Sequence, residues 1–311
     1  MFVLPTPPAV AFAIHAGAVI AAALMAAPGR RIALAPACLC LGVPWLVSPD
    51  RPLFRGLLTL GAFLCLFRTV DLVRERRRWP FWRRLLLMSY PFDSRSAARA
   101  PRALDGARLL AALGYALLAA AGLWVALVLA PAGGAGHWAL RWGGGAVFAY
   151  CVPDAVVSFC TFVHRAVGVV MPPVHRAPIL SRSLQEFWGE RWNLVVHGWL
   201  ARHCFFPLAR RRSPQLGVAA AFGASTALHA WLALVVVGAG AAVTMGSFFV
   251  VQGVLVLVQR RLRAARWPGP LARAFTVVAL LVPVPLFVEP ALAAIEGSKL
   301  LESSPVAPVS H

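Results

Sequence analysis

The chain has 311 residues, of which 60% are hydrophobic and only 13% are charged, and its mean hydropathy is +0.74. Because a soluble domain carries about 25% charged residues, this composition excludes an ordinary soluble protein and predicts an all-α protein embedded in a membrane. The net charge of +19 would also suit a protein that binds nucleic acid. However, the arginines lie in short loops between apolar runs, which is typical of the charges that orient membrane proteins, so we predict no nucleic-acid partner.

The six cysteines lie mostly inside apolar runs. They form no CxxC pair and show no Cys/His spacing that is typical of a metal site. We therefore interpret them as small apolar helix residues, and we predict neither a metal nor a cofactor.

Eight apolar segments predict membrane-spanning helices, because about 20 apolar residues suffice to cross the hydrocarbon core of a bilayer. In chain order they are residues 9–27, 32–47, 53–73, 109–129, 139–163, 215–237, 241–258 and 274–294. No basic residues precede the first segment, so we interpret it as a retained helix rather than a signal peptide. All but four of the 30 basic residues lie in or beside the loops that are cytoplasmic if both termini lie outside, which favours that orientation. Pro283 and Pro285 predict kinks in the last helix.

Residues 74–108 form a basic segment with ten arginines and the aromatic residues Trp79, Phe81 and Trp82. Arginines pair with lipid headgroups and aromatic rings favour the membrane interface, so this segment is expected to lie on the cytoplasmic leaflet. A surface that gathers an anionic acyl carrier is an alternative, less specific interpretation.

Charged residues also fall inside the predicted helices. Arg68 and Asp71 share a helix face at a spacing of three residues, so we expect them to form an ion pair. Asp154, next to Pro153, is costly at that depth, and we interpret it either as a partner for another helix or as part of a cavity wall.

Residues 194–208 are apolar but too short to span, and they contain His197, Arg202 and His203. Three arginines, 210–212, follow directly, and they would face outside if this segment crossed the membrane. The sequence therefore predicts a re-entrant or interfacial helix that begins and ends on the cytoplasmic side.

Between these apolar regions lies the segment SLQEFWGERWN, residues 183–193, which holds two Trp, one Phe and three charged residues. Polar groups at such a position need partners or a cavity. A second unusual residue, His229, lies in the predicted helix 215–237 after the small residues 223–227. Small residues allow close approach of a neighbouring helix or of a substrate chain.

Residues 183–193 resemble the signature SLxxFWGxRWN of wax-synthase-like members of the membrane-bound O-acyltransferase family. His229, 36 positions after Asn193, resembles the histidine of a second family pattern, SGLxHE. Here that pattern reads STALHA, with Thr226, Ala227 and Ala230 at the differing positions. The missing acid after the histidine puts any role of that carboxylate in doubt. The resemblance covers roughly residues 178–231.

The resemblance implies acyl transfer from an acyl thioester to a hydroxyl group. His229 would be the general base that takes the proton of the attacking alcohol, since the ordinary pKa of imidazole lies near neutral pH. Asn193 would donate a hydrogen bond to the thioester carbonyl or to the oxyanion, or would orient the hydroxyl.

Four further residues are candidate substrate-binding residues. Phe187, Trp188 and Trp192 would wall the acyl chain, or alternatively anchor the segment at the membrane interface. Arg191 would pair with Glu186 or Glu190, or would meet phosphate groups of the acyl carrier.

The sequence thus predicts an all-α polytopic membrane protein of about eight spanning helices plus a re-entrant or interfacial helix. A single acyltransferase domain would occupy residues 1–296, followed by a disordered polar tail, 297–311. We expect acyl-CoA and a lipophilic long-chain alcohol as substrates, and the inner membrane of a bacterium as the location. Alternative acceptors are a sugar, a sterol-like alcohol or a secondary metabolite. A different class of function, a transporter with a path through His229, Asp154 and Arg68, is also compatible with the sequence.

Overall fold

The computed structural model describes residues 6–211, 213–263 and 267–298. Within these residues the regular structure is almost entirely helical, which confirms the predicted fold class. The described strands are β1 (Ala98–Arg99) and β2 (Val169–Val170), which pair antiparallel with Ala98 opposite Val170. The predicted disordered tail lies outside the described residues from residue 299 onward.

The chain divides into two compact units. The first contains Met1–Pro91, Ala230–Val243 and Pro290–His311, and the second contains Phe92–His229 and Thr244–Glu289. Three helices contribute to both units: α10 (Pro214–Val236), α11 (Ala239–Arg261) and α13 (Val284–Glu296). The single domain expected for residues 1–296 stays a prediction.

Six helices in the described part of the chain are long and apolar enough to cross a membrane. They are α1 (Pro8–Met25), α3 (Pro52–Arg74), α5 (Gly106–Trp124) with the π-helical turn that follows it, α6 (Gly134–Ala166), α10 and α11. A seventh span results if α12 (Gly269–Leu281) and α13 count as one helix, bent by 41°. The bend lies between these helices at residues 282–283, so the kink predicted at Pro283 is confirmed.

The predicted number of eight spans is therefore too high for the described residues. The second predicted span, residues 32–47, coincides with only a short apolar helix, Arg31–Leu46. Its α-helical part, α2 (Leu34–Gly42), has nine residues, and 3-10 turns flank it. Pro44 lies in the second of these turns, and it has no backbone N–H to continue an α-helix. Six spans would leave both ends of the chain on the same side of the membrane and seven would not, so the orientation stays a prediction.

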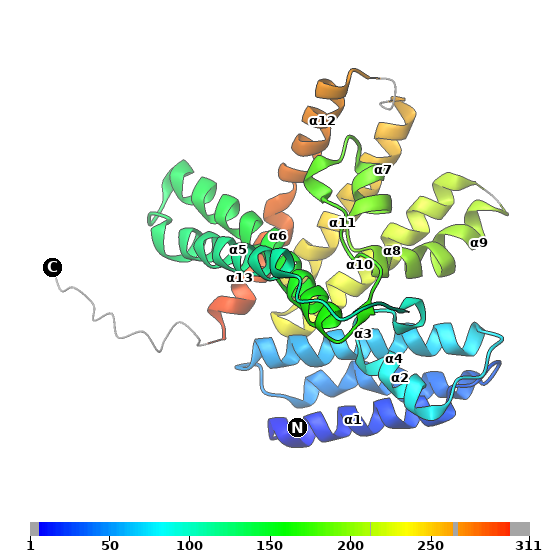
Figure 1. The fold of residues 1–311 in the computed structure, drawn as a ribbon. Helices are drawn as coiled ribbons and strands as arrows, with labels where there is room; N and C mark the ends of the chain where they lie inside the picture. Colours follow the sequence, from blue (N-terminus) through cyan, green and yellow to red (C-terminus); the bar gives the residue numbers. More distant parts are fainter. Residues whose placement is uncertain (1–5, 212, 264–266, 299–311) are drawn as a thin grey trace. The chain divides into compact units, whose positions relative to one another are not determined.

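In the first unit, α1, α2 and α3 pack together (Figure 1). Most of the buried side chains between them are small: Ala22, Ala23, Ala33, Ala37, Cys40, Ala62 and Cys65. Small side chains let helix backbones approach closely where no hydrophobic effect drives them together. The predicted pair is confirmed, because Arg68 Nη1 lies 3.6 Å from Asp71 Oδ2 and both side chains are buried.

In the second unit, α5 and α6 run side by side (Figure 1). Gly122 and Gly144 make this packing possible, since a Cβ atom on Gly122 would lie only 2.7 Å from the Gly144 carbonyl oxygen. Arg141 and Trp142 on α6 bind the Glu289 carboxylate, with Nε–Oε1 and Nε1–Oε1 distances of 2.9 and 2.8 Å.

The core that supports the unusual segment 183–193 also lies in the second unit. Leu184, Val218, Val256 and Ala279 are its buried residues, and Trp188 and Phe222 pack against them. The short helix α7 (Leu184–Glu186) thus brings the segment into the same core as residues of α10, α11 and α12.

After this segment the chain forms a short helical run. It consists of α8 (Leu194–Leu200), a π-helical turn (Ala201–Phe205) and α9 (Phe206–Ala209). It is not among the helices long enough to span. The remaining helix, α4 (Phe81–Ser89), buries Leu87 and Met88 and exposes Phe81 and Trp82, as expected for an amphipathic interfacial helix.

Candidate active site

The local sequence explains how residues 183–193 fold. Ser183 caps α7, since its Oγ accepts a hydrogen bond of 3.0 Å from the Glu186 N–H. A π-helical turn over Phe187–Arg191 follows and ends at Trp192. Asn193 then adopts the left-handed conformation, with φ of 42°, and caps α8. Asn tolerates this conformation better than most residues do, which suits it to a sharp change of chain direction.

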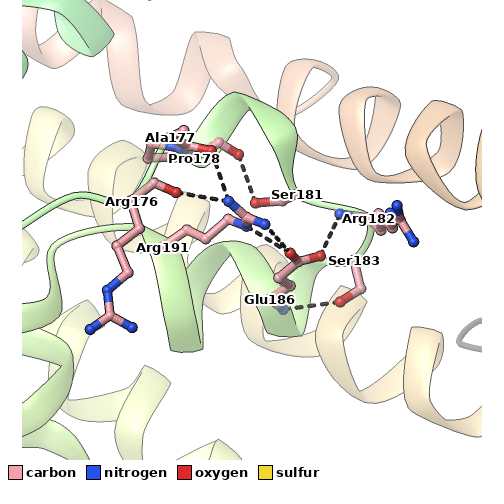
Figure 2. A network of polar contacts seen from close by, with 8 residues as sticks. All are labelled: Arg176, Ala177, Pro178, Ser181, Arg182, Ser183, Glu186 and Arg191. Atoms are coloured by element: carbon pink, nitrogen blue, oxygen red, sulfur yellow. Dashed lines mark hydrogen bonds and ion pairs between the residues drawn. The ribbon is translucent and has the colours of Figure 1, made fainter.

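Figure 2 shows the Arg191 side chain between Glu186 and the backbone of Arg176. Its Nε donates to Glu186 Oε1 at 2.6 Å, and its Nη1 donates to the Arg176 carbonyl oxygen at 2.9 Å. The Arg176 N–H in turn donates to the Arg191 carbonyl oxygen at 2.9 Å. Arg191 therefore ties the segment to the loop that precedes it.

Glu186 is held in its ionised form. Burial of this carboxyl opposes ionisation, but the hydrogen bonds from the Arg182 N–H and from Arg191 outweigh it, so the pKa of Glu186 lies below its ordinary value. The structure thus pairs Arg191 with Glu186. A contact between Arg191 and a phosphate group stays a prediction.

The aromatic residues of the segment stack on one another. The Phe187 and Trp192 rings are nearly parallel, with centroids 5.5 Å apart, and Trp188 meets Phe187 edge-on at 4.9 Å. Trp192 also stacks on His175, at 4.6 Å, and lies 5.7 Å from Tyr150. Contacts between these rings thus connect the segment to α6, which carries Tyr150.

His175 is a residue that the sequence analysis missed. Its Nδ1 lies 2.9 Å from Asp154 Oδ1, and the two side chains are only 4% and 12% exposed. A carboxylate oxygen accepts, so Nδ1–H is the donor. Asp154 is therefore a partner of a loop residue. The signal was present in the sequence, because a buried acid in a helix needs a polar partner and His175 lies just before the unusual segment.

His229 lies on α10, partly buried. Its Nδ1 is 2.8 Å from the Ser225 carbonyl oxygen one helical turn earlier. Since a carbonyl oxygen can only accept, Nδ1 carries the proton and Nε2 keeps its lone pair. The Phe249 ring stacks on the imidazole with centroids 3.7 Å apart, and Phe287 lies 6.5 Å away. The ring is thus fixed in one tautomer and one plane.

Phe249 connects His229 to the unusual segment. The Trp188 ring lies 6.0 Å from Phe249, and 6.1 Å from Phe222 on α10. A buried glutamine orients this indole, because Trp188 Nε1 donates to Gln252 Oε1 at 3.1 Å. The structure therefore brings Trp188 and His229 to one aromatic cluster, which the sequence analysis did not specify.

Asn193 lies at the start of α8, and its side chain caps that helix. Its Oδ1 accepts a hydrogen bond from the Val196 N–H at 3.3 Å. No hydrogen bond or ring contact joins Asn193 to His229 in the described part of the chain. Because Oδ1 is engaged, the Nδ2 amide group is the part of the side chain that is left to donate. The described residues also contain no group of three His, Cys, Asp or Glu side chains that could hold a metal ion.

Comparison with known proteins finds a family match over part of the chain. Residues 171–251, which include segment 183–193 and His229, match the model of the Membrane bound O-acyl transferase family. The chain is 32% identical over 145 residues to "Probable long-chain-alcohol O-fatty-acyltransferase 2" of Arabidopsis thaliana, covering 44% of this chain and 42% of that protein. It is 30% identical to "Probable long-chain-alcohol O-fatty-acyltransferase 1" of the same plant, covering 38% and 37%.

A third relative comes from another plant. The chain is 29% identical to the "Long-chain-alcohol O-fatty-acyltransferase" of Simmondsia chinensis, covering 37% of this chain and 36% of that protein. The matched parts thus span less than half the length of these relatives. The family-model match, residues 171–251, includes the residues that carried the resemblance to wax synthases. The chain is therefore similar to the membrane-bound O-acyltransferase family, and to its long-chain-alcohol acyltransferases, through the segment that contains the candidate active site.

Proposed function

We propose that this protein is an O-acyltransferase that transfers an acyl group from acyl-CoA to a long-chain alcohol. The observation that supports this best is the His229 imidazole. Its Nδ1–H is bound to the Ser225 carbonyl oxygen, so Nε2 is the atom that can accept a proton. The names of the relatives, which are those of long-chain-alcohol O-fatty-acyltransferases, support a fatty acyl group and a long-chain alcohol as acceptor.

In the proposed reaction, His229 Nε2 takes the hydroxyl proton while the alcohol oxygen attacks the thioester carbonyl carbon. The C–S bond then breaks, and the proton passes from the imidazolium to the departing thiolate, which leaves as free thiol. General-base assistance of this kind contributes about 10²–10⁴ in rate. The Nδ2 group of Asn193 would donate to the carbonyl oxygen as negative charge develops on it.

The aromatic residues would hold the acyl chain. Trp188 and the phenylalanines around His229 offer an apolar surface next to the proposed base. Alcohol and product are both lipophilic, so both can diffuse laterally in the bilayer. We further propose that the protein lies in the cytoplasmic membrane of a bacterium, where acyl-CoA is available on one side.

The other acceptors and the other class of function are weaker proposals. Transfer to a sugar, a sterol-like alcohol or a secondary metabolite would need the same base, and only the acceptor would differ. A transport path is less well supported, since Asp154 is engaged with His175 and Arg68 lies next to Asp71. The match of residues 171–251 to the Membrane bound O-acyl transferase family also favours acyl transfer.

The test uses membranes that contain the full chain, labelled acyl-CoA and a panel of acceptors. We expect a labelled ester with long-chain alcohols, little product with sugars or sterols, and none with His229→Ala. His137→Ala is the matched control, because the partly buried His137 also forms an Nδ1–carbonyl hydrogen bond, of 2.7 Å to Pro131. The absence of any ester with any acceptor, from a protein that is inserted and abundant, would refute acyl transfer.

A further inference from the structure

A pocket of about 240 Å³ lies in the first unit and shares no lining residue with the candidate active site. Its walls come from the C-terminal end of α1, from the following residues 26–30, from the C-terminal end of α3 and from the basic segment 74–108. This volume is several times the roughly 30 Å³ that one water molecule occupies in the liquid. The pocket can therefore hold a small polar group together with a few water molecules.

The lining of the pocket is strongly positive. Four arginines contribute to it, Arg30, Arg77, Arg78 and Arg84, and none of the described residues in its walls is acidic. Arginine presents several N–H donors in a planar fork that matches the oxygens of a phosphate group. A concave surface of this composition favours a phosphate over a carboxylic acid, because a phosphate has more oxygens to share among four guanidinium groups.

Two donors in the pocket are already oriented. Arg84 is anchored, since its Nη1 donates to the Ala26 and Leu24 carbonyl oxygens at the end of α1. Its Nε and the indole Nε1 of Trp79 are buried without a hydrogen-bond partner among the described residues. The Arg77 guanidinium lies 4.4 Å from the centre of the Trp79 ring, which holds it over the same wall. Buried donors without a partner are costly, and an anion would satisfy them.

The position of the pocket indicates where such an anion comes from. Two apolar helices that are long enough to span the membrane, α1 and α3, both end here, and the Gly29 N–H donates to the Val73 carbonyl oxygen at 2.9 Å. The adjacent α4 exposes 59% of Trp82, and Leu24 in the pocket wall is 58% exposed. Exposed apolar and aromatic side chains beside arginines are typical of the membrane interface.

We propose that this pocket binds the phosphate group of an anionic phospholipid headgroup. The four arginines and the Trp79 N–H would contact the phosphate, and Leu24 would contact the start of an acyl chain. The same phosphate chemistry would also accept coenzyme A or inorganic phosphate, so the experiment must separate these sources. The proposal does not depend on acyl transfer, because the pocket and the candidate active site share no residue.

The test measures binding to the purified full-length protein by native mass spectrometry, with phosphatidylglycerol, phosphatidylcholine, coenzyme A and inorganic phosphate as separate probes. We expect the wild type to prefer phosphatidylglycerol over phosphatidylcholine. The variant Arg30→Gln/Arg77→Gln/Arg78→Gln should bind phosphatidylglycerol at least about tenfold more weakly, since each arginine near a headgroup contributes to binding. Arg76→Gln is the matched control, because Arg76 is exposed and does not line the pocket.

A second variant, Trp79→Phe, keeps an aromatic ring at this position but lacks the indole N–H, so it should weaken binding by a few-fold while the protein folds normally. If coenzyme A or phosphate binds and the triple variant loses that binding instead, the phosphate site is supported and its ligand is soluble. Equal binding of phosphatidylglycerol by the wild type and the triple variant, with no loss of coenzyme A or phosphate binding, would overturn the proposal.

Discussion

His229 and His175 have the same hydrogen-bonding pattern in different settings. In each, Nδ1 donates at a distance of 2.8 or 2.9 Å and Nε2 is left with its lone pair. The acceptor of His229 is the uncharged Ser225 carbonyl, whereas that of His175 is the Asp154 carboxylate. His229 lies on a helix against Phe249, and His175 lies on a loop against Trp192.

The two settings suggest different roles. The His175 side chain is only 4% exposed and stacks on Trp192, the residue directly before Asn193. We infer that His175 fixes Trp192 and Asn193, and that His229 does the proton transfer.

The comparison is tested most directly by replacing each histidine with glutamine. His229→Gln should lower kcat by about 10²–10⁴, the usual contribution of a general base. His175→Gln keeps a donor for Asp154 and should lower kcat by less than about tenfold. Both values come from ester formation in membranes with matched protein amounts. The reverse ranking would assign the base to His175.

Substitutions of Asn193 separate a role of its amide in catalysis from a role of its left-handed backbone in stability. Asn193→Ala and Asn193→Gly both remove the amide and should each lower kcat by about 10²–10³ if it stabilises the oxyanion. The left-handed backbone, with φ of 42°, costs alanine about 1–2 kcal/mol but costs glycine little. Thermal unfolding in detergent should therefore show a larger loss of stability for alanine. An active glycine variant would restrict Asn193 to a structural role.

The third prediction concerns the partner of His175. Asp154→Ala leaves the buried His175 N–H without an acceptor and should destabilise the protein by about 1–3 kcal/mol. The double variant Asp154→Ala/His175→Phe removes both polar groups and should recover part of that loss in thermal unfolding. Ser158→Ala, one turn further along α6 and also buried, is the control. No recovery in the double variant would mean that the two residues do not act as a pair.

The smallest effect is expected at Glu186, which pairs with Arg191, the residue that ties the segment to the loop of His175. Its folded-state pKa lies below the ordinary value of 4.5, so it stabilises the fold above that pH and loses this contribution as pH falls through the folded pKa. The pair is partly exposed, so the contribution is below about 1 kcal/mol. Comparing the Tm of wild type and Glu186→Gln, we expect a difference at pH 7 that disappears toward pH 3. A difference independent of pH would exclude the carboxylate as its source.

Much of this protein is readable from local sequence. Composition and apolar runs predicted a helical membrane protein, because a chain in lipid has to satisfy its backbone hydrogen bonds internally. Pro283 predicted the break before α13. Segment 183–193 and His229 indicated a resemblance to a family whose model matches residues 171–251. Each of these signals depends on residues that are close neighbours in the chain.

The tertiary structure decided the rest. Residues 31–46 are apolar enough to span, yet their α-helical part ends at Gly42, just before the turn that contains Pro44. The partner of Asp154 is 21 residues away, and the indole of Trp188 is oriented by Gln252, 64 residues away. Hydrophobic periodicity specifies which residues are buried but not which ones meet. Only packing determines that His229 shares Phe249 with Trp188, because contacts between helices depend on side-chain shapes from distant parts of the chain.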